Sequence, residues 1–157
     1  MRSEWFRDIT SLGGAPVYIA IAVIALHTDV HFFYRLVAGF LFSYLFVTPF
    51  RILFFRERPE RQNYSNIMHK IDAGSFPSQH VTRGTILWFL VSSFFNTPIF
   101  WIISIIAIIL IAYTRISLKR HHKADAIGGF IAGLIAFFLI LYLNPYIASA
   151  AQSLGFP

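Results

Sequence analysis

The segment Phe32–Phe55, FFYRLVAGFLFSYLFVTPFRILFF, decides the fold class of this chain. A helix that crosses a membrane needs about 20 mostly apolar residues, and this segment exceeds that length. The segment Ala124–Leu143, ADAIGGFIAGLIAFFLILYL, also reaches it. Three further apolar segments, Leu12–Leu26, Val81–Phe95 and Pro98–Tyr113, lie near or below the limit. We therefore expect an all-α integral membrane bundle of about five transmembrane helices, forming a single domain over residues 1–157.

The composition supports a chain that has lipid as its solvent. Hydrophobic residues make up 57% of the chain and charged residues only 13%, whereas a soluble domain has about 25% charged residues. The net charge of +6 fits a nucleic acid, an anionic membrane surface or an anionic substrate. Because the basic residues lie between long apolar runs, we expect phospholipid headgroups or a phosphorylated substrate, and no nucleic acid. The absence of Cys excludes thiol catalysis, disulfides and thiolate metal sites.

The basic residues gather on one predicted side of the bilayer. If five helices alternate across it, this side carries the N-terminus, residues 56–78 and residues 114–123. Counting the helix ends on this side, only Arg35 of the 13 basic residues lies on the other side. The positive-inside rule then favours the cytoplasm, although arginines that hold phosphate would create the same bias. The stretch Met1–Asp8, with aromatic residues between two arginines, predicts either an interfacial helix or a frayed terminus.

Arg51 and Arg58 form the first of three polar clusters on this side. They lie seven residues apart, or two helical turns, so a continuing helix would point both to one side. Pro59 disfavours helical backbone at Arg58 and pushes that residue towards the helix end. The alternative is that both arginines extend from the helix end to the headgroups.

The second cluster, Ser75-Phe-Pro-Ser-Gln-His80, leads directly into the third apolar segment. Ser78 is a good N-cap, and the free backbone N–H groups of the following turn would form an anion site. His80 lies in that turn, where it can give a proton to a leaving oxygen. The alternative is an ordinary capped helix with a histidine at the interface.

The third cluster contains His121 and Asp125, which we expect on one face at the start of the last helix. A carboxylate on one ring nitrogen fixes the tautomer and leaves the other nitrogen free to attack. His122 could also reach Asp125, and a plain surface pair is the alternative. Considered together, the three clusters supply cations, a nucleophile and a proton donor, which are the parts that phosphoryl transfer needs.

The spacing of these clusters resembles the three signature motifs of the type 2 phosphatidic acid phosphatase superfamily. That pattern is Lys, six residues and Arg-Pro; then Pro-Ser-Gly-His; then Ser-Arg, five residues, His, three residues and Asp. The chain keeps every spacing, with Arg51 in place of Lys, Gln79 in place of Gly and Thr114 in place of Ser. None of these changes removes a reacting group. Membrane members commonly have six spanning helices, and we expect this chain to lack the first.

The resemblance implies a two-step hydrolysis that needs no metal or other cofactor. By similarity, His121 attacks phosphorus and Asp125 orients it, while His80 protonates the leaving oxygen and then activates water. The motif register selects His121 over His122. The groups that would bind the phosphoryl oxygens are Arg51, Arg58, Arg115 and the backbone around Ser78 and Gln79.

These features favour a multi-pass lipid phosphatase of the cell membrane. A polyprenyl diphosphate is the preferred substrate, because a small bundle suits a small headgroup on a long chain. Phosphatidic acid, phosphatidylglycerophosphate and lipid A phosphates are alternatives, as is a phosphotransferase that passes the phosphoryl group to a lipid acceptor. A non-enzymatic transporter of anions or lipids is the alternative from a different class. The small-xxx-small pair Gly129 and Gly133 predicts close packing of the last helix.

Overall fold

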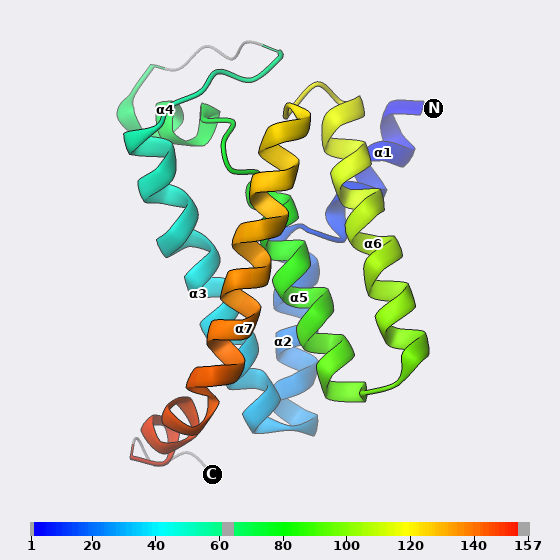
Figure 1. Ribbon diagram of the computed structural model, residues 1–157, viewed down its shortest axis with the longest axis vertical. Coiled ribbons are helices and arrows are strands. Elements are labelled where there is room, and N and C mark those ends of the chain that lie inside the picture. Colours follow the sequence, from blue (N-terminus) through cyan, green and yellow to red (C-terminus); the bar gives the residue numbers. More distant parts are fainter. Residues whose placement is uncertain (1, 61–64, 154–157) are drawn as a thin grey trace.

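The computed structural model describes residues 2–60 and 65–153, which form a bundle of helices without any strand. Most helices run along the long axis of the molecule, and α4 lies at the end that also carries the N-terminus (Figure 1). The expected all-α bundle is confirmed. In chain order the helices are α1 Arg2–Ser11, α2 Ala15–Thr28, α3 Val30–Leu53, α4 Ile67–Ala73, α5 Gln79–Phe95, α6 Pro98–Ser117 and α7 Lys123–Ser153.

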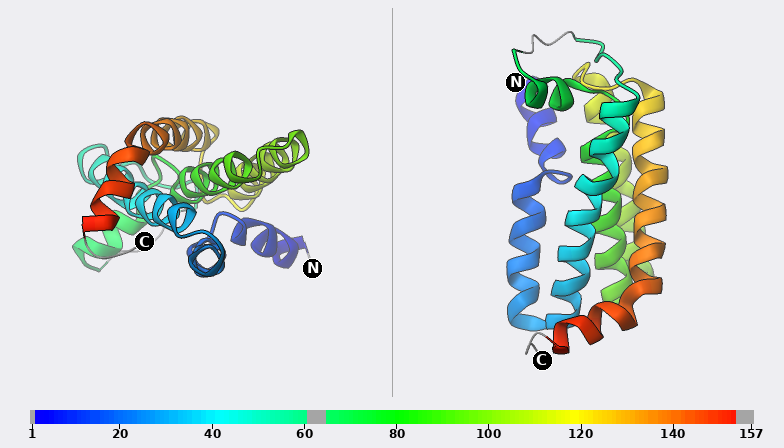
Figure 2. Two further views of the ribbon diagram at one scale, coloured as in Figure 1. Left: turned by 90° about the horizontal axis from the view of Figure 1, so that it is seen from below. Right: turned by 90° about the vertical axis from the view of Figure 1, so that its left-hand side faces the viewer.

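Short connections with clear end signals pair neighbouring helices. Asp29 ends α2 and caps α3, since its Oδ1 accepts a hydrogen bond of 2.7 Å from the backbone N–H of Phe32. Asn96 ends α5 in the left-handed conformation with φ 47°, and Pro98 then opens α6. Both connections are too short to cross the bundle, so each pair is antiparallel. Pro145 lies inside α7, whose last turns bend away from the bundle axis (Figure 2).

Helix α5 lies at the centre of the bundle and packs against α3, α6 and α7. Most of its side chains are buried, so few of them face the lipid. The core that includes it is apolar and comes from five helices, α2, α3, α5, α6 and α7. Its buried members include Leu36, Ile86, Leu87, Leu90, Phe137 and Ile140.

Two glycines let α7 approach α5 closely. A Cβ atom added at Gly133 would lie 2.5 Å from the Cβ of Thr85, and one added at Gly129 would lie 2.7 Å from the carbonyl oxygen of Ser78. Any side chain at either position would therefore push the two helices apart. The close packing expected from the small-xxx-small pair is confirmed.

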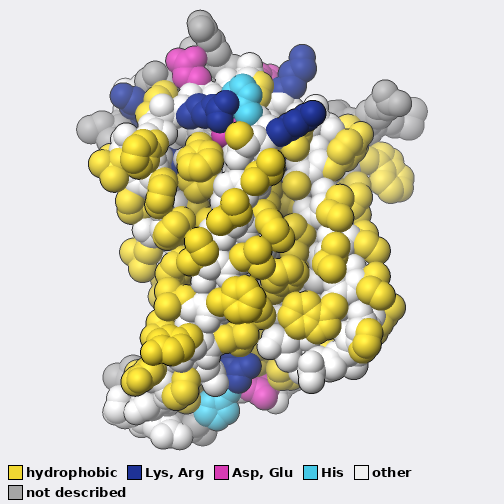
Figure 3. All heavy atoms as spheres, in the orientation of Figure 1, with side chains coloured by type: hydrophobic (Ala, Val, Ile, Leu, Met, Phe, Trp, Pro, Cys, Tyr) yellow, Lys and Arg dark blue, Asp and Glu magenta, His cyan; other side chains and the backbone are white. Residues whose placement is uncertain are grey.

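The outer surface fits a bilayer. In Figure 3, apolar side chains cover the middle of the visible face, and Lys and Arg gather at the end that holds the N-terminus and α4. Four candidate spans are found among the described residues, at Glu4–Thr28, Val30–Leu53, Pro98–Ser117 and Lys123–Ala150. The protein is a multi-pass membrane protein, and the buried α5, with 17 residues, accompanies these spans as the fifth helix of the bundle.

The N-terminal stretch is helical over the residues that the structure describes. Helix α1 packs beside α6, and the hydroxyls of Thr10 and Thr114 share a hydrogen bond of 3.0 Å. A turn at residues 12–14 separates α1 from α2, and the first candidate span, Glu4–Thr28, covers parts of both helices. The placement of α1 at the interface stays a prediction.

Candidate active site

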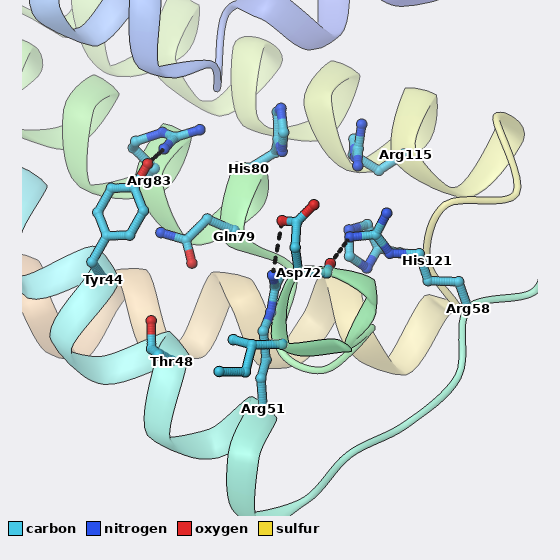
Figure 4. A pocket seen from close by; sticks show the side chains of 11 residues that line it. Tyr44, Thr48, Arg51, Arg58, Asp72, Gln79, His80, Arg83, Arg115 and His121 are labelled. Carbon is cyan, nitrogen blue, oxygen red and sulfur yellow. Dashed lines mark hydrogen bonds and ion pairs between the residues drawn. The ribbon is translucent and has the colours of Figure 1, made fainter. Parts of the chain in front are cut away.

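A cavity of about 460 Å³ lies where α3, α5 and α6 meet α4 and the loop before α7. Figure 4 shows side chains from all these elements pointing towards it. Most of them are polar or charged, whereas two other cavities of the bundle are lined mainly by apolar side chains. The lining residues are Tyr44, Thr48, Arg51, Arg58, Ile71, Asp72, Gln79, His80, Arg83, Arg115 and His121.

Three of the predicted phosphate ligands are arginines of this cavity. Arg51 lies in the last turn of α3 and Arg115 in the last turn of α6, and both are buried. Within the described part of the chain, neither Nε atom has a hydrogen-bond partner. Buried cations with unused donors are costly unless an anion satisfies them. The arrangement therefore suits a phosphoryl group.

Arg58 reaches the cavity by a different route from the one expected. Helix α3 ends at Leu53, so helical periodicity does not align Arg58 with Arg51. The segment after α3 is not helical, and from it the Nη2 group of Arg58 donates to the backbone carbonyl of Asp72. The expectation of a shared helical face is wrong, but the two arginines still line one cavity.

Asp72, on α4, places a carboxylate among these arginines. Its Oδ1 lies 3.9 Å from the Nη1 atom of Arg51, and its side chain is 83% exposed. Because solvent screens this exposed carboxylate and 3.9 Å is a long contact, the pair contributes little to stability. Asp72 is therefore a weak partner of Arg51, which a phosphate could replace. The sequence analysis did not identify this residue.

His121 lies in the loop before α7 and is almost fully buried. Its Nδ1 atom is 2.8 Å from the backbone carbonyl oxygen of Ser75, and a carbonyl can only accept, so Nδ1 carries the proton. Burial, together with the charges of Arg115, Arg58 and Arg51, lowers the pKa of His121 to about 2. The ring is therefore neutral, with a lone pair on Nε2.

The Asp125 carboxylate forms hydrogen bonds at the junction between this loop and α7 and none to the ring of His121. Its Oδ2 lies 4.0 Å from Nδ1 of His121, too far for a hydrogen bond. Instead Oδ2 accepts a bond of 2.7 Å from the backbone N–H of His122 and one from the Ser75 hydroxyl, and Oδ1 accepts 3.1 Å from Nη1 of Arg56. The bond to His122 is the second half of a capping box.

This geometry corrects two expectations about the third cluster. Helix α7 begins at Lys123, so His121 precedes it and the two residues are not on one helical face. The group that fixes the tautomer of His121 is the Ser75 carbonyl, and the Asp125 carboxylate makes no direct hydrogen bond to the ring. A backbone acceptor leaves no trace in side-chain spacing.

The start of α5 contributes Gln79 and His80 to the cavity, while Ser78 lies behind it. The amide of Ser78 donates 3.0 Å to the carbonyl of Asp125, and its hydroxyl has no partner among the described residues. Gln79 reaches across to α3, where its Nε2 lies 3.2 Å from the carbonyl oxygen of Ser43. The first-turn amides after Ser78 have no intrahelical acceptor, as at any helix start.

The comparison with protein families gives this site its context. A model of the PAP2 superfamily matches residues 43–148, which is more than half of the chain. The chain belongs to the PAP2 superfamily. The matched region runs from α3 to α7 and contains every residue of the cavity. The protein is a membrane-embedded lipid phosphate hydrolase, so the alternative of a non-enzymatic transporter is not favoured.

Two curated PAP2 relatives are similar to the chain. Phosphatidylglycerophosphatase B of Bacillus subtilis is 26% identical, over 89% of this chain and 76% of the relative. A putative undecaprenyl-diphosphatase of Escherichia coli is 33% identical, over 53% of this chain and 42% of the relative. No solved structure matches the chain.

Within this PAP2 cavity the structure brings together six of the eight predicted site residues. Ser78 and Asp125 do not line it and are joined to each other by a backbone hydrogen bond. Of the two adjacent histidines only His121 lines it. The further lining residues Tyr44 and Thr48 could have been found from the sequence, since they precede Arg51 by seven and three residues and so share its face of a helix.

Proposed function

We propose that this PAP2 protein cleaves the terminal phosphate of a lipid through a phosphohistidine on His121, in the cell membrane. The observation that carries the proposal is the state of His121. Its ring is buried and neutral, its Nδ1 proton is held by Ser75, and it lines a cavity with three arginines. A neutral imidazole with a free Nε2 beside three arginine side chains is suited to attack a phosphoryl group.

The proposed reaction has two steps. In the first, Nε2 of His121 bonds to phosphorus while the bond from phosphorus to the lipid oxygen breaks, and His80 gives that oxygen a proton. In the second, His80 takes a proton from water, whose oxygen attacks phosphorus and releases phosphate from His121. Arg51, Arg58 and Arg115 stabilise the charge on the equatorial oxygens in both steps.

A polyprenyl diphosphate is the preferred substrate. The small extramembrane part of the bundle suits a small headgroup, and one relative is named a putative undecaprenyl-diphosphatase. The other relative is named a phosphatidylglycerophosphatase, so that lipid is the first alternative, ahead of phosphatidic acid and lipid A phosphates. Transfer to a lipid alcohol instead of water is the alternative reaction.

A phosphate-release assay on purified protein in detergent micelles tests the proposal. The panel contains a polyprenyl diphosphate, phosphatidylglycerophosphate, phosphatidate and lipid A, each without an added acceptor. We expect release to be fastest with the diphosphate, and His121→Ala to lower it by about 10³-fold or more. The matched control His122→Ala changes the neighbouring ring, which does not line the cavity, and should keep substantial activity. Full activity in His121→Ala would refute the nucleophile.

A further inference from the structure

The cavity extends along α3 and α5 beyond the residues used in the proposed reaction. On α3, Tyr44 and Thr48 precede Arg51 at helical spacing, so the three side chains share one face. On α5, Arg83 follows Gln79 by four residues, about 6 Å along the helix. The proposed two-step reaction gives no role to Tyr44, Thr48 or Arg83.

Arg83 is a buried cation without an acidic partner. Its side chain is only 4% exposed, and its two hydrogen bonds are Nε to the Gly13 carbonyl at 3.0 Å and Nη1 to the Tyr44 hydroxyl at 3.1 Å. No carboxylate pairs with it in the described ranges 2–60 and 65–153. Its Cζ also lies 5.8 Å from the ring centroids of Phe40 and of Tyr44. Because a guanidinium has five N–H donors, three of them remain for an anion, and no carboxylate among the described residues neutralises the charge.

The position of Arg83 in the cavity indicates which part of a lipid substrate would lie next to it. In Figure 4, Arg83 and Tyr44 lie at the end of the cavity opposite His121, and His80 lies between them. Arg83 is also one turn further from the start of α5 than Gln79, and so further into the bundle. A lipid whose terminal phosphate meets His121 would extend past His80 towards Arg83 before its tail reaches the bilayer.

We infer that Arg83, aligned by Tyr44, forms a second anion subsite that binds a phosphate next to the one removed and so favours substrates with two phosphates. This inference rests on the proposed function. With a diphosphate, His121 bonds to the terminal phosphorus, the bond to the bridging oxygen breaks, and His80 protonates that oxygen. The lipid leaves as a monophosphate, whose negative charge Arg83 stabilises.

A purely structural role for Arg83 predicts something different. Its bond to Gly13 ties the turn between α1 and α2 to α5, and Trp88 on the same helix ties that turn again, through Nε1 to the Leu12 carbonyl at 3.2 Å. Trp88 does not line the cavity. Trp88→Phe is therefore the matched control, because it removes the same kind of tie without changing the subsite.

The test compares kcat/KM for a polyprenyl diphosphate, phosphatidylglycerophosphate and phosphatidate in micelles. We expect Arg83→Gln to lower the ratio of diphosphate to phosphatidate by about 10-fold or more, as expected for lost hydrogen bonds to a charged group. Tyr44→Phe, which keeps the ring and removes the hydroxyl, should lower the ratio by a smaller factor. Trp88→Phe should keep the ratio of the unaltered protein.

The outcomes separate the possible results. If Arg83→Gln also lowers kcat/KM for phosphatidylglycerophosphate, the subsite accepts a second phosphate across a glycerol. If kcat/KM for that lipid is unchanged, the subsite is restricted to directly bridged phosphates. Both results support a second anion subsite. An equal loss on all three lipids, matched by Trp88→Phe, overturns the subsite and leaves the proposed function intact. No release from any lipid by the unaltered protein overturns both.

Discussion

Replacing Asp125 by Asn tests how the charge behind the nucleophile acts. The Asp125 carboxylate is fully buried, and its oxygens accept bonds from Arg56, Ser75 and the backbone of His122. The amide of Asn has one oxygen and one NH2 group, so at least one of these donors would face another donor. The tautomer of His121 should survive the change, because the Ser75 carbonyl holds it.

The size of the effect follows from the 4.0 Å between Oδ2 of Asp125 and Nδ1 of His121. As His121 attacks, its ring gains positive charge, and a unit charge at about 4 Å contributes about 4 kcal/mol at an effective dielectric constant near 20. That energy corresponds to about 10³-fold in rate. Because Arg56 already neutralises part of the carboxylate, we expect Asp125→Asn to lower kcat by about 10²- to 10³-fold.

The assay is steady-state phosphate release by purified variants, with thermal unfolding in the same micelles as a check on folding. An unpaired buried donor should lower stability by about 1–3 kcal/mol, so the folded fraction is measured before rates are compared. A kcat within about 3-fold of the unaltered protein would refute the reasoning. A loss well beyond about 10³-fold would also refute it, because the carboxylate would then contribute more than its charge at this distance allows.

Three further predictions follow from the cavity. Asp72→Asn should lower KM by about 2- to 5-fold, because it frees Arg51 for the substrate; a raised KM in the phosphate-release assay would show that Asp72 assists binding. The ¹⁵N chemical shifts of His121 should show a neutral ring with a proton on Nδ1 from pH 8 to pH 5, because the pKa of about 2 lies below that range; an imidazolium at pH 5 would contradict this. In intact cells, a membrane-impermeant thiol reagent should label His31→Cys and spare Ser65→Cys if the basic end faces the cytoplasm, and the reverse pattern would place the cavity outside.

The sequence predicted the bundle and most of the candidate site for separate reasons. Long apolar runs specify membrane helices because lipid tolerates almost no other backbone, so each of the five runs became a helix. The cations and histidines could be predicted because their spacing resembles three motifs, although the geometry first inferred for them was only partly right. Arg58, for example, lines the cavity from a segment without regular secondary structure and not from a helix.

The remaining features depend on contacts that sequence spacing does not encode. The acceptor for His121 is a backbone carbonyl 46 residues away in the chain, and any residue type could provide it. Asp72 meets Arg51 only because α4 folds over the end of α3. The short spacing of His121 and Asp125 indicated direct contact, but the chain between them is a cap and not a full helical turn.

Trapping the covalent intermediate tests the central claim most directly. Phosphohistidine survives alkali, so a polyprenyl diphosphate labelled in its terminal phosphate is mixed with the protein, the reaction is quenched in alkali, and the labelled peptide is sequenced by mass spectrometry. We predict phosphate on His121, retained in His122→Ala and lost in His121→Ala. Phosphate on His122, or rapid hydrolysis with no phosphorylated protein at any time, would contradict the account.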